Sequence, residues 1–380
     1  MEMEQRTKLL RNFKLNRKGN IVKMSKTYDL TKEEVANAWN SVKRAKGSEG
    51  IDGTTIKSFE ENLDRNLYRI WNRMASGSMM FDKLLKVKIP KAKGGCRILG
   101  IPTIKDRVVQ TVIKNRLESL AEATFHEDSY GYRPGKSAID AVGKARTRCF
   151  KCKWTLDIDI HKFFDEIPHK QLIKIVEDLT DDKMMRLYIR RYLGVGNDND
   201  LEKVEAMGIP QGGVISPLLA NIFLNEVFDN WMAKEYRWIN FERYADDLLV
   251  HFYTKEKAEQ MMELIIKRFE TFGLKLNMDK SKIVFCGNDS EPEYKKHKYP
   301  RKFTFLGYDF KPRRFQKKTV FTPGIGTGAL NSIGKKLKKM NVLKRTQESI
   351  ENVASKLNPL IRGWINYYGN FRRSALKENG

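Results

Sequence analysis

Aspartates in two short segments are the residues of this chain best suited to do chemistry. Asp246 and Asp247 stand side by side at a corner between two β-prone runs, residues 241–244 and 248–252. Adjacent carboxylates at a hairpin tip repel each other, so ionising both is costly unless a cation lies beside them. Mg²⁺ prefers such hard oxygen ligands and completes its shell with water and substrate phosphates. A pair of aspartates alone also fits a solvated turn, so a second site has to decide between the two interpretations.

The second site is the segment 154–161, in which apolar residues alternate strictly with polar ones. A strand with this alternation would place Asp157, Asp159 and His161 on one face. Acids are disfavoured in strands, and an edge strand with a wet face is the ordinary explanation for them. Together with Asp246 and Asp247, however, the pattern predicts that strand and hairpin lie side by side in one sheet. The resulting carboxylate cluster would hold two divalent ions that activate a 3′-hydroxyl and stabilise a leaving pyrophosphate.

Composition points to a nucleic acid as the partner. The 380 residues carry a formal net charge of +25, which suggests a long polyanion. Residues 311–345 contain eleven Lys and Arg and no acid, with a predicted glycine-rich link at 323–328 followed by a helical pattern. No apolar run approaches a membrane span, the N-terminus lacks a secretory signal, and four scattered cysteines cannot form a disulfide framework. We therefore expect a cytoplasmic protein with no membrane partner.

Several elements are predicted by local patterns. A helix should begin after the N-cap Thr31, with Glu34 completing a capping box. Strands at 84–90 and 97–102 should flank a cationic hairpin turn at 91–97, which suits a triphosphate. Helices are predicted over 59–74, over 106–125 with Leu117 and Leu120 among the apolar residues on one side, and over 169–193. Another helix should begin at Ser216 as N-cap, behind the glycines of Gln211-Gly-Gly.

Ordered motifs along most of the chain resemble the bacterial group II intron-encoded reverse transcriptase (maturase) family. They are Gly50-Ile-Asp-Gly53, Ile89-Pro-Lys91, Arg97-Ile-Leu-Gly-Ile-Pro-Thr103, Ser129-Tyr-Gly-Tyr-Arg-Pro134, Asp159-Ile-His-Lys-Phe-Phe-Asp165, Gly208-Ile-Pro-Gln-Gly-Gly213, Tyr244-Ala-Asp-Asp247, Gly273-Leu-Lys-Leu-Asn277, Phe305-Leu-Gly-Tyr308 and Arg362-Gly-Trp-Ile-Asn-Tyr-Tyr-Gly369. The resemblance implies an α+β right-hand polymerase with fingers, a palm with an antiparallel sheet, and a helical thumb. Its implied divisions are a basic N-terminal extension (1–24), fingers (25–153), palm (154–322) and a maturase-like thumb (323–380). Because the sequence ends at residue 380, it also implies a short thumb and no endonuclease domain.

The resemblance assigns roles residue by residue. Asp159, Asp246, Asp247 and the carbonyl of Ile160 would hold two Mg²⁺ ions, with Mn²⁺ as a substitute, and Lys280 would protonate pyrophosphate. The incoming nucleotide would meet Lys91, Arg97, Phe164, Gln211 and Tyr244. Residues 305–308 resemble the primer grip, and nucleic acid would contact Lys335, Lys336, Lys338, Lys339 and Arg362. The implied partners are an RNA template, a DNA or RNA primer, dNTPs and a structured cognate RNA such as a group II intron.

Phe164 helps to distinguish a reverse transcriptase from other polymerases. It stands five residues beyond Asp159, where the implied fold puts its ring beneath the sugar of the incoming nucleotide and Phe163 in the core. RNA-dependent RNA polymerases typically carry another Asp at this position, which argues against that class. A nucleotidyl cyclase would need neither thumb nor basic run. A stand-alone relative recruited to phage defence or CRISPR spacer acquisition and an RNA-binding splicing factor both stay open, as does the oligomeric state.

Overall fold

The computed structural model describes residues 27–90, 95–195, 206–287, 299–315, 318–340 and 348–371, and the backbone of two short strands, β1 (Phe13–Leu15) and β2 (Ile21–Lys23). The chain divides into two compact units. The first comprises Met1–Thr124 and Phe164–Phe223, and the second comprises Phe125–Phe163 and Leu224–Gly380. In the described ranges no helix is both long and apolar enough to cross a bilayer.

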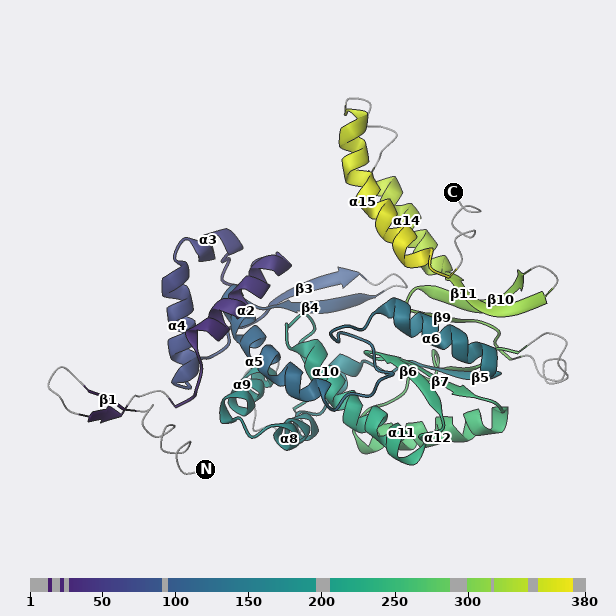
Figure 1. The fold of residues 1–380 in the computed structure, drawn as a ribbon, viewed down its shortest axis with the longest axis horizontal. Coiled ribbons are helices and arrows are strands. Elements are labelled where there is room, and N and C mark those ends of the chain that lie inside the picture. Colours follow the sequence, from purple (N-terminus) through teal and green to yellow (C-terminus); the bar gives the residue numbers. More distant parts are fainter. Residues whose placement is uncertain are drawn as a thin grey trace. The chain divides into compact units, whose positions relative to one another are not determined.

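The first unit is mainly helical, with one described two-stranded hairpin besides β1–β2 (Figure 1). Its elements are α2 (Lys32–Ala45), α3 (Ile56–Glu60), α4 (Leu63–Ala75), β3 (Leu85–Pro90), β4 (Cys96–Ile101), α5 (Ile104–Glu122), α8 (His169–Leu179), α9 (Lys183–Gly194) and the start of α10 (Ser216–Leu224). The predicted start of α2 is confirmed, because Thr31 and Glu34 form both hydrogen bonds of a capping box. Strand β3 pairs antiparallel with β4, as predicted.

Several predicted helix boundaries are wrong. Residues 59–74 do not form one helix but the end of α3 and most of α4. The predicted helix 169–193 is interrupted before Asp182, whose carboxylate accepts hydrogen bonds from the amides of Met184 and Met185 and so starts α9 anew. On the apolar side of α5, Leu117 is buried and Leu120 is 40% exposed. Ser216 is the first residue of α10 rather than its cap, and its hydroxyl donates to the carbonyl of Pro210.

The second unit is built on a four-stranded antiparallel sheet in the order β6-β7-β5-β8. The strands are β6 (Asn240–Tyr244), β7 (Asp247–Phe252), β5 (Trp154–Ile158) and β8 (Lys282–Phe285). Helix α6 (Ala138–Lys151) covers one face and α12 (Lys255–Thr271) the other (Figure 1). The predicted pairing of strand and hairpin is confirmed, and β5 is an interior strand rather than an edge.

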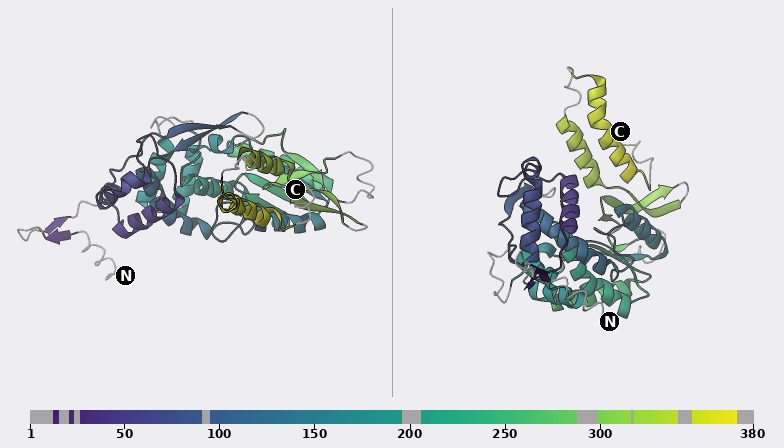
Figure 2. Two further views of the ribbon diagram at one scale, coloured as in Figure 1. Left: turned by 90° about the horizontal axis from the view of Figure 1, so that it is seen from above. Right: turned by 60° about the vertical axis from the view of Figure 1, so that its left-hand side comes forward.

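The remaining elements of the second unit extend this core. A three-stranded sheet in the order β11-β10-β9 contains β9 (Phe303–Phe305), β10 (Tyr308–Phe315) and β11 (Lys318–Ile325). The helices are α14 (Thr327–Met340) and α15 (Ile350–Tyr368), which extend away from that sheet (Figures 1 and 2). The predicted glycine-rich link is wrong in part, because residues 323–325 end β11. Two elements cross the division between the units, α7 (Phe163–Glu166) and α10, and the latter continues as the π-helix η2 (Asn225–Asp229) and α11 (Asn230–Glu235).

Candidate functional site

The paired aspartates lie at the tip of the β6–β7 hairpin. Tyr244 pairs with Asp247, so the turn consists of Ala245 and Asp246. Ala245 has a φ of 55°, a left-handed conformation that costs an L-residue energy. This turn therefore needs support from the surrounding structure.

Support comes first from a buried arginine. Arg243 donates from Nη1 to the carbonyl oxygen of Ala245 at 3.1 Å and from Nε to Asp229 Oδ1 at 2.8 Å. Its Nη2 lies 2.5 Å from Asp229 Oδ2, and neither side chain is exposed to solvent. A two-pronged pair of this kind fixes both distance and orientation. The π-helix η2 presents Asp229, in keeping with the frequent occurrence of π-turns at functional sites.

The segment Ser129–Gly131 supports the same turn from another side. The amide of Tyr130 donates to the carbonyl of Arg243 at 2.8 Å. A Cβ on Gly131 would lie 2.4 Å from the amide nitrogen of Ala245. Only glycine permits this approach, which gives the Ser-Tyr-Gly-Tyr motif a structural role that the sequence did not reveal.

A buried polar network ties the strands to α6. Glu242 Oε2 lies 2.5 Å from His251 Nε2, and His251 Nδ1 lies 3.1 Å from the hydroxyl of Thr155. Arg148 donates to Glu242 at 2.6 Å and to Asp128 at 2.7 Å. Satisfied networks of this kind rigidify a core, and this one links β5, β6 and β7 behind the turn.

Asp159 follows directly after β5, which is shorter by three residues than the predicted segment. Ile158 pairs with Leu248, so the next residue, Asp159, comes beside Asp247 in the register. The amide of Asn277 donates to the carbonyl of Asp159 at 2.8 Å, and that of His161 to Lys275 at 2.8 Å. The motif Gly273–Asn277 thus backs the first aspartate, while the side chain of Ile160 is buried.

The carboxylates influence one another. Burial of its carboxylate and repulsion from Asp246, Asp157 and Asp159 raise the pKa of Asp247 to about 7. The residue as a whole is exposed, so water screens part of this repulsion. Lys280 Nζ lies 3.1 Å from Asp159 Oδ1 and 3.3 Å from Oδ2. In the described residues no three acidic, His or Cys side chains form a ready metal cluster.

These carboxylates fit a hard divalent cation. A cation beside Asp247 would relieve the repulsion that raises its pKa. Carboxylate oxygens are the ligands that such ions prefer. The donor set therefore suits the ion that the sequence predicted.

The first unit carries the predicted nucleotide loop. The amide of Gly100 on β4 donates to the carbonyl of Gln211 at 2.7 Å, and Gln211 Nε2 donates to Asp165 at 3.2 Å. Gly212 has a φ of 108°, and a Cβ there would lie 2.8 Å from the Gly100 carbonyl. Gly212 is thus required by close backbone packing, whereas a Cβ on Gly213 would collide with the side chain of Tyr192. Arg97 is exposed on β4.

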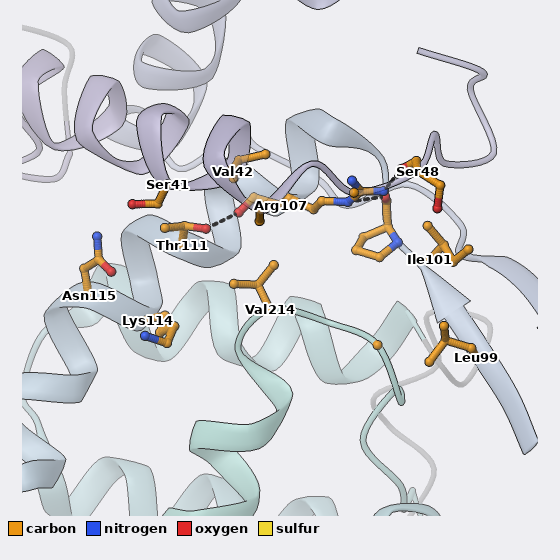
Figure 3. A pocket seen from close by; sticks show the side chains of 14 residues that line it. Ser41, Val42, Ser48, Leu99, Ile101, Arg107, Thr111, Lys114, Asn115 and Val214 are labelled. Atoms are coloured by element: carbon orange, nitrogen blue, oxygen red, sulfur yellow. Dashed lines mark hydrogen bonds between the residues drawn. The ribbon is translucent and has the colours of Figure 1, made fainter. Parts of the chain in front are cut away.

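A pocket of about 410 Å³ lies beside this loop (Figure 3). Leu99 and Val214 contribute apolar wall, and Lys114 and Asn115 add polar groups from α5. Arg107 is a structural residue, because its Nε donates to the carbonyl of Pro102 at 3.1 Å. The pocket combines apolar and hydrogen-bonding surface next to Gln211.

Other predicted site residues are placed as follows. Phe163 is buried, as predicted, and Phe164 is half-buried with its carbonyl accepting from the Ile209 amide at 2.7 Å. Lys91 lies outside the described residues. The predicted nucleic-acid contacts are all exposed, with Lys335, Lys336, Lys338 and Lys339 on α14 and Arg362 on α15.

Residues 305–308 form a tight hairpin at the base of α15. Leu306 and Gly307, with φ of 49° and 79°, make a two-residue turn, and the Tyr367 hydroxyl donates to the Leu306 carbonyl at 2.8 Å. The ring of Tyr308 lies 5.4 Å from those of Tyr367 and Tyr368. The turn is therefore packed against α15.

Comparison with known proteins gives matches over most of the chain. Residues 89–310 match the family "Reverse transcriptase (RNA-dependent DNA polymerase)", and residues 330–379 match "Group II intron, maturase-specific domain". Protein YkfC of Escherichia coli is 31% identical over 273 residues, covering 62% of this chain and 71% of YkfC. The group II intron-encoded protein LtrA of Lactococcus lactis is 31% identical over 182 residues, which is 47% of this chain but only 30% of LtrA. A telomerase structure from Candida albicans aligns with 85% of this chain and 60% of its own at 13% identity, with a TM-score of 0.47.

Proposed function

Since this chain belongs to the reverse transcriptase family, the RNA-dependent DNA polymerases, we propose that it extends a primer on an RNA template at its aspartate cluster. Its helices and antiparallel sheet have the right-hand polymerase fold. The observation that carries the proposal is the register of β5 and β7, which sets Asp159 beside the Ala245–Asp246 turn and Asp247. This register supports the proposal that Asp159, Asp246 and Asp247 act together, from two chain segments, on one substrate.

Reverse transcriptases use divalent metal ions. In this chain the carboxylates of Asp159, Asp246 and Asp247, with the carbonyl of Ile160, would hold two Mg²⁺ ions, or Mn²⁺ in their place. When bound, such ions lower the charge that develops on the attacking and leaving oxygens. Lys280, which forms an ion pair with Asp159, would give a proton to the leaving pyrophosphate.

Residues of the first unit would bind the incoming dNTP. Arg97, exposed on β4, and Lys91 carry the charges for its triphosphate, and Gln211 is held at the loop by β4. Tyr244 would contact the nucleotide from the end of β6. Phe164 would exclude a 2′-hydroxyl by steric collision. The pocket beside Gly212 offers apolar wall for a template base.

The chain's own RNA partner is proposed to be a structured RNA such as a group II intron. The match of residues 330–379 to the maturase-specific domain supports this role over phage defence or spacer acquisition. The exposed cations of α14 and α15 would meet nucleic-acid phosphates there. The described primer-grip turn at residues 305–308, packed on α15, would position the primer end.

Substitution of the aspartates tests the chemistry. Asp159→Ala and Asp246→Ala should abolish Mg²⁺-dependent cDNA synthesis on a primed RNA template and leave RNA binding intact. Asp178→Ala, an exposed acid on α8, is the matched control and should behave as wild type. Activity of either first variant within about tenfold of wild type, or 1.4 kcal/mol of barrier, would place the site elsewhere.

A further inference from the structure

Helix α4 carries an exposed row of arginines that the polymerase site does not use. Arg65, Arg69 and Arg73 follow one another at four-residue intervals and are all exposed. Four residues advance a helix by about one turn, so the three lie along one face in a row about 12 Å long. Like charges at this spacing repel, and Arg65 lies in the first turn, where the helix dipole disfavours a cation. The dipole favours Arg73, which lies in the last turn, but helix stability explains neither Arg65 nor the repulsion along the row.

The three arginines differ from neighbouring cations of the first unit in their ion pairing. Among the described residues none of them forms an ion pair, whereas Lys43 pairs with Glu60 at 2.5 Å and Lys105 with Asp82 at 2.8 Å. Unpaired guanidinium groups on one face create a positive potential there. That potential favours an anion from outside the described chain.

A pocket of about 350 Å³ opens beside this row. Its lining residues are Phe59, Asn66, Arg69, Ile70, Arg73, Met79 and Lys105. Phe59, Ile70 and Met79 are buried, and Phe59 stacks on Trp39 at 4.8 Å, so the floor is rigid. The rim is cationic, and the planar fork of arginine matches two oxygens of a phosphate.

We propose that this α4 surface, formed by Arg65, Asn66, Arg69 and Arg73, binds the phosphate backbone of an RNA strand, with one phosphate in the pocket. The row continues through Arg65, which does not line the pocket, so it fits a chain of phosphates better than a single anion. The surface shares no residue with the Gln211 loop or the pocket beside it. The inference rests on the proposed function in taking RNA as the ligand, and it adds a second RNA contact apart from the primed template.

Binding of an unprimed RNA hairpin over a salt series tests the surface. The variant Arg69→Gln/Arg73→Gln should weaken binding at least tenfold and lower the log-log salt slope by about 1.5, because two guanidinium groups no longer neutralise phosphates. The control Lys170→Gln/Lys174→Gln removes two exposed cations at the same spacing on α8 and should change neither quantity. Equal slopes in wild type and the α4 variant, or an equal weakening in the control, would overturn the proposal.

Two further measurements are needed. The first distinguishes RNA from a small phosphate compound as the ligand of the α4 surface, and the second distinguishes a failure of the α4 inference from a failure of the proposed function. ATP and inorganic phosphate at millimolar concentration should not displace the hairpin from wild type; displacement that disappears in the α4 variant would mean a small phosphate ligand and refute RNA. Primer extension on a short primed template should stay within about twofold of wild type in the α4 variant. If the wild-type protein makes no cDNA, the proposed function is wrong. If the wild-type protein makes cDNA and the α4 variant has the same salt slope for hairpin binding, only the α4 inference is wrong.

Discussion

Asp229→Asn removes the charge that balances Arg243 beneath the aspartate turn. Both side chains are fully buried and are joined by two hydrogen bonds, at 2.8 Å and 2.5 Å. Breaking a buried pair by neutralising one partner typically costs about 3–5 kcal/mol, because the other charge stays uncompensated. Native domains are stable by about 5–15 kcal/mol. The variant should therefore still fold, but with a large part of its stability lost.

The same substitution should act on the chemistry through the turn. Arg243 donates to the carbonyl of Ala245 at 3.1 Å, so a displaced guanidinium frees the turn that orients Asp246 and Asp247. We expect the Mg²⁺ concentration for half-maximal cDNA synthesis to rise severalfold. Arg243→Lys keeps the charge but not the fork, so it should lose less stability and yet raise the Mg²⁺ requirement similarly.

Urea unfolding followed by tryptophan fluorescence measures the first effect, and an Mg²⁺ titration of primer extension measures the second. Asp181→Asn is the matched control, since it breaks the exposed pair between Asp181 and Arg186 and should change stability by about 0.5 kcal/mol or less. A loss below about 1 kcal/mol for Asp229→Asn would refute the electrostatic reasoning. A full loss of stability with an unchanged Mg²⁺ requirement would refute the positioning role.

Three further predictions concern the sugar, the duplex and pH. Phe164→Val should raise kcat/KM for rNTPs relative to matched dNTPs by about tenfold, as about 1.4 kcal/mol of steric clash is relieved; an unmoved ratio would make Phe164 a packing residue. Changing Lys335, Lys336, Lys338 and Lys339 together to Gln should lower the log-log salt slope of template-primer binding. The decrease should be roughly 1 for each of these lysines that neutralises a phosphate. An unchanged slope would show that this face of α14 does not contact nucleic acid. Burial raises the pKa of Asp106 to about 6 from 3.8, so its ionisation opposes folding above that pH. Asp106→Asn should therefore stabilise the protein by up to about 3 kcal/mol at pH 8 and by almost nothing near pH 4 in urea unfolding; a gain independent of pH would contradict this cause.

Local patterns in the sequence predicted what local chemistry determines. The capping box at Thr31 and Glu34 lies within one helical turn, and β3 and β4 are joined by a short connection. The β5 segment was predicted from its alternation, and its pairing with the hairpin from the need to share a charge site. Each of these inferences required only neighbouring residues or one pair of segments. Family resemblance added the residue roles, which remain predictions.

What the sequence did not reveal depends on interactions between distant segments. Asp229 looks like an ordinary acid near the end of an apolar run, yet the π-helix turns it toward Arg243. Gly131 looks like a loop glycine until the Ala245 amide is found against it. The sequence did contain one sign of the contact with Arg243. Asp229 is an acid within a long apolar helix, and a buried acid there requires a cation beside it. The break before Asp182 was missed because apolar periodicity continues through it and only the cap reveals the new start.

The support beneath the aspartate turn has a consequence for how the site would work. Ala245 is held in a left-handed conformation by Arg243 and Gly131, while burial and then repulsion from its acidic neighbours raise the pKa of Asp247. Both costs are met by buried interactions made during folding, before any cation arrives. A cation that binds there would relieve repulsion without having to order the backbone, so more of its binding energy would remain available for substrate oxygens. Weakening the scaffold should therefore appear first as a higher metal requirement and only then as lost chemistry.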